Sequence, residues 1–138
     1  MSEPIKSISS SPNARTVFGT GLRAAVIAAV ANAAIWLVAS AVNSMKVGLP
    51  ETIVASLITV IMGGVVYLLL SRFTKKATIV FTVIGVVFAL LSAVGPISAM
   101  SSAPMPGMAL FNTTTMIATE LMHIVAAAVA IRAYTQIK

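Results

Sequence analysis

The sequence predicts an all-α integral membrane protein, a four-helix bundle with up-down-up-down topology. Of the 138 residues, 59% are hydrophobic and only 9% are charged, whereas a soluble domain carries about 25% charged residues. The apolar residues form four runs, each close to the roughly 20 residues that a helix needs to cross a bilayer. Lys and Arg lie between these runs and do not gather into a patch. The chain therefore has too few charges to cover a water-soluble domain.

Each apolar run predicts one transmembrane helix. None of the runs alternates polar and apolar residues along its length, which argues against membrane-spanning strands. The connections are short, so consecutive helices are expected to pack antiparallel. Residues 1–22 are expected to form a mobile cytoplasmic tail. The predicted spans cover residues 24–42, 52–71, 77–97 and 109–131.

Proline, glycine and acidic residues mark the boundaries of these spans. Pro50 and Glu51 precede the second span, where both residue types favour the start of a helix. Gly95 and Pro96 interrupt the third span near its end. Trp36 and Tyr134 are candidates for aromatic anchors at the membrane interface.

The distribution of basic residues predicts the orientation. Of the nine Lys and Arg residues, eight lie on one side of the predicted bundle and only Lys46 lies on the other. The side with more Lys and Arg is expected to be cytoplasmic. Both termini are therefore expected in the cytoplasm, with the protein in the inner (plasma) membrane. Cleavage of a signal peptide after residues 39–41 is disfavoured, because the preceding polar tail and apolar run are both too long. The basic residues on the side of the termini are Lys6, Arg15, Arg23, Arg72, Lys75, Lys76, Arg132 and Lys138.

Glu120 and His123 lie near the middle of the fourth span. Glu120 is the only acid after Glu51, and His123 is the only histidine. A charge at such a depth costs about 3 kcal/mol or more, which makes it a functional-site hypothesis. Residues at positions i and i+3 of a helix lie within reach of each other. We therefore expect Glu120 and His123 to share a polar stripe that faces the bundle or a subunit interface.

Asn32 is the strongest polar group of the first span. It lies nine residues after Arg23, and His123 lies nine residues before Arg132. At about 1.5 Å per residue, both side chains reach the same depth, with Glu120 one turn further out. The sequence therefore predicts an intramembrane polar layer of Asn32, Glu120 and His123.

Three interpretations of this layer stay open. In the first, the layer only fixes helix packing by hydrogen bonds worth about 0.6 kcal/mol each, and the protein is a non-enzymatic structural or accessory bundle. In the second, Glu120 binds a proton or a cation in a small transporter or channel subunit, which we expect to be oligomeric because four helices enclose little space. In the third, His123 ligates haem or a metal. A single Glu-x-x-His pair is half of the set that a di-metal bundle uses.

Other chemistry has little support in the sequence. There is no cysteine, no nucleophile-elbow motif and no phosphate-binding glycine loop, so no cofactor and no enzymatic activity are expected. The basic residues form no patch or stripe for nucleic acid. Met100, Met105 and Met108 supply thioethers of the kind that bind Cu(I), although methionine more often fills irregular packing. The lipid bilayer is the expected partner, and no substrate is indicated.

Three short motifs carry a resemblance to a known family. They are residues 35–39 (Ile-Trp-Leu-Val-Ala), Gly95-Pro96, and residues 121–123 (Leu-Met-His). With them the chain resembles a family of small four-span membrane proteins of unknown function, common in actinobacteria, over nearly its whole length. The resemblance implies a four-helix bundle and no activity, and Glu120 is not assigned to its pattern. Small multidrug exporters share the size, but their membrane glutamate lies in the first span, where this chain has Asn32.

Overall fold

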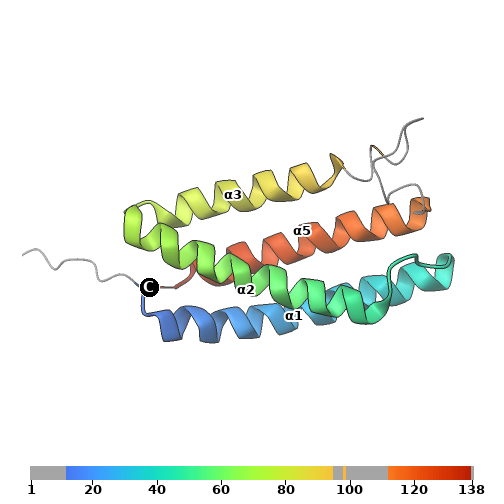
Figure 1. Cartoon of the computed structure of the whole chain (residues 1–138), viewed down its shortest axis with the longest axis horizontal. Coiled ribbons are helices and arrows are strands. Elements are labelled where there is room, and N and C mark those ends of the chain that lie inside the picture. Colours follow the sequence, from blue (N-terminus) through green and yellow to red (C-terminus); the bar gives the residue numbers. More distant parts are fainter. Residues whose placement is uncertain (1–11, 95–97, 99–111, 138) are drawn as a thin grey trace, which may run out of the picture.

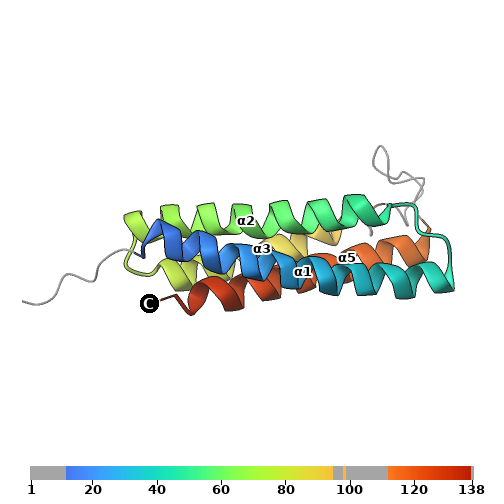
Figure 2. The ribbon, with the colours of Figure 1, turned by 90° about the horizontal axis from the view of Figure 1, so that it is seen from below.

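The computed structural model describes residues 12–94, 98 and 112–137, and these form an all-α antiparallel bundle (Figures 1 and 2). Three of the helices are long and apolar enough to cross a membrane, and α3 is a shorter apolar helix. The predicted fold class is confirmed. The last residues of the predicted third span lie outside the described part. The helices are α1 (Ala14–Val42), α2 (Leu49–Phe73), α3 (Ala77–Ser92) and α5 (Thr113–Thr135).

Helix α1 begins ten residues before the apolar run that predicted it. The Asn13 side chain caps the helix by accepting a hydrogen bond of 2.9 Å from the Arg15 amide. Val17 and Gly21 in this first part are buried against the other helices. Residues 14–22, which we expected in a mobile tail, therefore belong to the bundle. The hydropathy pattern missed them because their polar residues lie on the exposed face.

The two ends of the bundle differ in charge. Helices α1 and α3 start, and α2 and α5 end, at one end of the molecule (Figure 1). We call it the basic end. The loop between α1 and α2 lies at the opposite end, here called the Lys46 end, together with Glu51 in the first turn of α2. The described residues of the basic end include Arg15, Arg23, Arg72, Lys75, Lys76 and Arg132.

An aromatic cluster forms the core near the basic end. Tyr134 of α5 is fully buried, stacks on Tyr67 at 5.9 Å between ring centroids, and meets Phe81 edge-on at 5.6 Å. Its hydroxyl donates a hydrogen bond of 2.7 Å to the Val60 carbonyl. Tyr134 is therefore a core residue, and its prediction as an interfacial anchor was wrong.

The four helices do not pack evenly. Helix α1 packs mainly on α2 and α5, whereas α3 packs on α5 more than on α2. Helices α2 and α3 are joined by a short turn at the basic end and diverge toward the Lys46 end, with α5 visible between them (Figure 1). A hollow of about 350 Å³ lies between α2, α3 and α5 on this side of the bundle.

Candidate polar pocket between α1, α2 and α5

Asn32 is the most deeply buried polar side chain in the middle of α1, with 3% of its surface exposed. Its Nδ2 donates to Ser56 Oγ at 2.9 Å and to the Met122 carbonyl at 3.3 Å, so it ties α1 to both α2 and α5. Ser56 in turn donates to the Thr52 carbonyl at 2.7 Å. The Oδ1 atom of Asn32 is buried and has no partner in the described part of the chain. One acceptor of this carboxamide is thus left without a hydrogen bond from the described residues.

Asn32 lines a cavity of about 180 Å³, which we call the polar pocket. Glu51, exposed in the first turn of α2, lies at the Lys46 end of this pocket. Glu51 is the only acid among the lining residues, and no Lys or Arg is among them. The pocket therefore presents acceptors and a negative charge. The remaining polar residues that line it are Thr52, Ser56, Thr59, Thr119 and His123.

His123 reaches the same pocket from α5. Its side chain is half-buried, and its Nδ1 atom is buried without a partner among the described residues. The imidazole lies edge-on to the ring of Phe88 on α3, with 6.3 Å between the ring centroids. The depth count from the sequence placed Asn32 and His123 at one level, and the structure brings both to one pocket.

Glu120 does not line this pocket. Both of its carboxyl oxygens lie 3.1 Å from Ser92 Oγ at the end of α3. Ser92 Oγ also lies 2.6 Å from the Ala89 carbonyl, and a hydroxyl has only one proton to donate. Ser92 Oγ therefore shares this one proton between the Ala89 carbonyl and the Glu120 carboxyl oxygens, which accept it. Glu120 thus attaches the end of α3 to α5, away from Asn32.

Glu51 is the member of the pocket that the sequence did not indicate. We had assigned it only to the start of α2, a role that the structure also shows. Its side chain shares a helical face with Ala55 and Thr59, since residues four apart in a helix lie one above the other. That face leads from the Lys46 end down to Thr59, where the polar pocket ends.

Comparison with known proteins places the chain in a family. A family of unknown function (DUF6069) matches residues 12–137. The chain belongs to this family. No curated protein and no solved structure matches it. The DUF6069 match begins just before Asn13, the cap of α1, so residues 14–22 fall within the family as they fall within the bundle.

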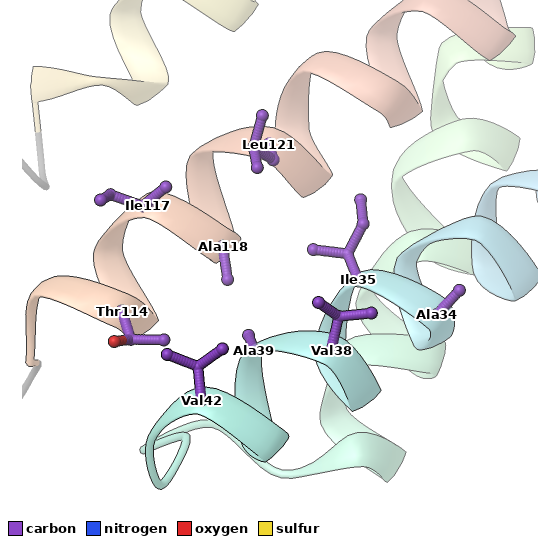
Figure 3. A pocket seen from close by; sticks show the side chains of 9 residues that line it. All are labelled: Ala34, Ile35, Val38, Ala39, Val42, Thr114, Ile117, Ala118 and Leu121. Atoms are coloured by element: carbon purple, nitrogen blue, oxygen red, sulfur yellow. The ribbon is translucent and has the colours of Figure 1, made fainter.

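A second hollow of this DUF6069 protein is apolar. It has a volume of about 510 Å³ between the Lys46-end halves of α1 and α5 (Figure 3). Apart from the Thr114 hydroxyl, its lining side chains are aliphatic, from Ala34, Ile35, Val38, Ala39, Val42, Ile117, Ala118 and Leu121 (Figure 3). The lining of this hollow thus offers a single hydroxyl to orient a polar ligand.

The described residues of the DUF6069 protein hold no group of three His, Cys, Asp or Glu side chains that converge as metal ligands. The loop methionines considered for copper, Met100, Met105 and Met108, lie outside the described residues. Trp36, in the motif of residues 35–39, donates its Nε1 proton to the Val47 carbonyl at 2.7 Å. This bond fastens the loop that carries Val47 beside the polar pocket.

Proposed function

We propose that this DUF6069 protein is a non-enzymatic membrane bundle whose polar pocket binds a small ligand that donates hydrogen bonds. The proposal rests on one observation, the buried and unpartnered Oδ1 of Asn32, a residue that lines a cavity large enough for a small molecule. A buried acceptor without a partner costs about 1–3 kcal/mol, so a ligand that supplies a donor is stabilised there. The carboxylate of Glu51 favours a ligand that is neutral or positively charged.

The charge distribution supports a location in the bacterial inner membrane with both termini in the cytoplasm. Six Lys and Arg side chains of the described residues lie at the basic end, whereas the Lys46 end has Lys46 and Glu51. Cytoplasmic segments carry the excess of Lys and Arg, so the polar pocket would face the outside. Reporter fusions at the C-terminus test this orientation, and activity of a periplasmic reporter there would contradict it.

His123 provides a direct assay because it is the only histidine. The full chain, labelled with ¹⁵N-histidine and placed in phosphatidylcholine nanodiscs, gives the imidazole signals of a single residue. We expect ethanolamine and glycerol to shift these signals saturably, because both donate hydrogen bonds and fit a cavity of about 180 Å³. Acetate, which is an anion, is expected to leave them unchanged.

The matched variants separate the pocket from a nonspecific effect. Asn32→Leu removes the free acceptor, and Ser56 keeps its bond to the Thr52 carbonyl, so the fold is expected to persist. This variant should lose the ligand-dependent shift. Asn43→Leu, an exposed position in the loop at the Lys46 end, should keep it. A pocket that holds only water would give no saturable shift in the wild type, and that result would overturn the proposal.

A proton- or cation-coupled role for Glu120 is the second candidate. What favours it is a half-buried carboxyl within a helix that is apolar enough to span a membrane. The contact with Ser92 favours the structural role instead, because the Glu120 carboxyl accepts from Ser92 and so joins α5 to the end of α3. Glu120→Gln separates the two. A cellular phenotype that depends on pH in the wild type and is lost in Glu120→Gln supports coupling, and an unchanged variant supports the structural role.

The third interpretation, haem or metal ligation by His123, stays a prediction. Purified protein from haem-replete cells would show a Soret band that His123→Ala abolishes.

A further inference from the structure

An apolar groove adjoins the polar pocket on the open side of the bundle. The groove has a volume of about 350 Å³ between α2, α3 and α5, within the range of about 300–1,000 Å³ that is usual for ligand sites. Thr59 and Ala126 line both hollows. Met62 and Val66 continue the wall along α2, and Ala127 lies on the α5 side. The two hollows therefore form one path along the same side of α2.

Polarity changes in one direction along this path. On α2, the polar pocket extends from Glu51 to Thr59, and the apolar groove extends from Ile58 to Val66. The fifteen residue steps from Glu51 to Val66 rise by about 22 Å along α2. This length exceeds the hydrocarbon thickness of one leaflet, which is about 15 Å, or half of a core of about 30 Å. The polar part lies toward the Lys46 end, and the apolar part extends from the middle of the bundle toward the basic end. A lipid in the leaflet at the Lys46 end has its polar headgroup at that end and its hydrocarbon chain toward the middle of the bilayer. The polar and apolar parts of the path follow the same order.

Two contacts involve the helices that border this path. The Ser92–Glu120 pair joins the end of α3 to α5. Phe88 lines the apolar groove and contacts the ring of His123, which lines the polar pocket. The imidazole thus lies at the junction of the two hollows, where a headgroup would meet its chain.

From this arrangement we infer that the ligand is an amphiphile with one hydrocarbon chain and a headgroup that donates hydrogen bonds and carries no negative charge. The inference rests on the proposed function, since the headgroup occupies the polar pocket and meets Asn32. The headgroup selects the ligand, because the groove is no more apolar than the surrounding lipid and gives a chain little advantage over the bilayer. Alcohol and amine headgroups both supply the required donor, and the Glu51 carboxylate disfavours phosphate.

Photo-crosslinking in a bilayer tests this inference. The full chain is placed in phosphatidylcholine nanodiscs, because the choline headgroup donates no classical N–H or O–H hydrogen bond. The probes are oleylamine, monooleoylglycerol and oleyl phosphate, each with a diazirine in the chain. We expect the amine and the glycerol probe to label residues 58–66 and 126–131, and unlabelled amine to compete. Oleyl phosphate is expected to give only background labelling.

A pair of neighbouring alanines on α5 provides the matched control. Ala127 lines the groove and is half-buried, whereas Ala128 is exposed and lines neither hollow. Ala127→Phe should lower specific labelling about tenfold, which corresponds to about 1.4 kcal/mol. Ala128→Phe adds the same volume outside the groove and should label as the wild type does. Met62→Trp, on the opposite wall, is a second blocking variant.

The possible results separate this inference from the proposed function. If ethanolamine shifts the His123 signals but the long-chain probes label no preferred residues, the amphiphile is wrong and the small-ligand pocket stands. If neither ligand class binds, both proposals fail. Equal labelling by oleyl phosphate would contradict the donor headgroup. Equal losses in Ala127→Phe and Ala128→Phe would contradict the groove, provided that ethanolamine still shifts His123 in both variants and so shows that they are folded.

Discussion

Replacing Gly64 with alanine should destabilise the bundle, while the same change at Gly63 should not. A Cβ atom at Gly64 would lie 2.7 Å from Tyr134 Oη and 3.0 Å from its Cζ, closer than real Cβ atoms approach. Tyr134 is unable to retreat, because it is fully buried between Tyr67 and Phe81 and its hydroxyl is held by the helix of Gly64.

The magnitude follows from two opposing effects. Overpacking a core costs about 1–3 kcal/mol, and replacing glycine by alanine within a helix returns up to about 1 kcal/mol. Taking the middle of the first range and subtracting the second effect, we expect Gly64→Ala to lower the free energy of unfolding by about 1 kcal/mol. At Gly63, the nearest atoms to an added Cβ are 3.5 Å away on Tyr134 and 3.7 Å away on Phe81, which is ordinary contact. Gly63→Ala should therefore be neutral, or stabilising by up to about 1 kcal/mol.

Reversible unfolding in mild detergent micelles, with increasing denaturing detergent, measures both variants against the wild type. Adding Tyr134→Phe removes the Oη atom that the new Cβ meets. The double variant Gly64→Ala/Tyr134→Phe should be more stable than the sum of the single effects implies, with a coupling of about 0.5–3 kcal/mol. Equal effects of the two alanine substitutions, or strict additivity in the double variant, would refute this description of the core.

Substitutions at three further positions probe the Lys46 end. Asn112→Ala removes the cap of α5, whose Oδ1 accepts from the Thr115 amide at 2.7 Å, and should lower the unfolding free energy by about 1 kcal/mol. Trp36→Phe loses the indole hydrogen bond to the α1–α2 loop and should cost about 0.5–1.5 kcal/mol in the same unfolding assay. Glu120→Leu should release the end of α3 and speed its backbone hydrogen exchange. Glu120→Gln, whose amide oxygen still accepts from Ser92, should not. Equal exchange in both variants would argue against this attachment.

The helices were readily predicted because the sequence separates apolar runs with basic and helix-breaking residues. The start of α1 was harder to predict from the sequence. Residues 14–22 are helical because Val17 and Gly21 face the bundle, and a hydropathy average does not register one buried face beside Arg15 and Arg23. Capping by Asn13 was the local signal that marks the start of α1.

The sequence predicted how deep in the bundle the residues of the polar layer lie, but not toward which helix each side chain points. Counting residues placed Asn32 and His123 at one level, and both line the polar pocket. Glu120 lies only about 60° from His123 around α5, since three residues turn a helix by 300°. That angle is enough to direct Glu120 to Ser92 on α3 and His123 to the pocket. The direction depends on where α3 packs, which the sequence of α5 does not specify.

Tyr134 was misplaced for a related reason. A tyrosine two residues after Arg132 fits an interfacial anchor when α5 is considered alone. Its burial depends on Gly21 of α1 and Gly64 of α2, which leave room for its ring and hydroxyl. These glycines are far apart in sequence, so the pairing becomes apparent only when the helices are placed together.

A crystal or cryo-EM structure of the full chain with monooleoylglycerol tests the central claim most directly. We predict non-protein density in the polar pocket, about 2.7–3.0 Å from Asn32 Oδ1, the distance of a hydroxyl hydrogen bond. The density should continue past Thr59 into the groove between α2 and α3. A structure in which Asn32 Oδ1 meets only protein atoms or water, with lipid density absent from the pocket, would contradict the claim.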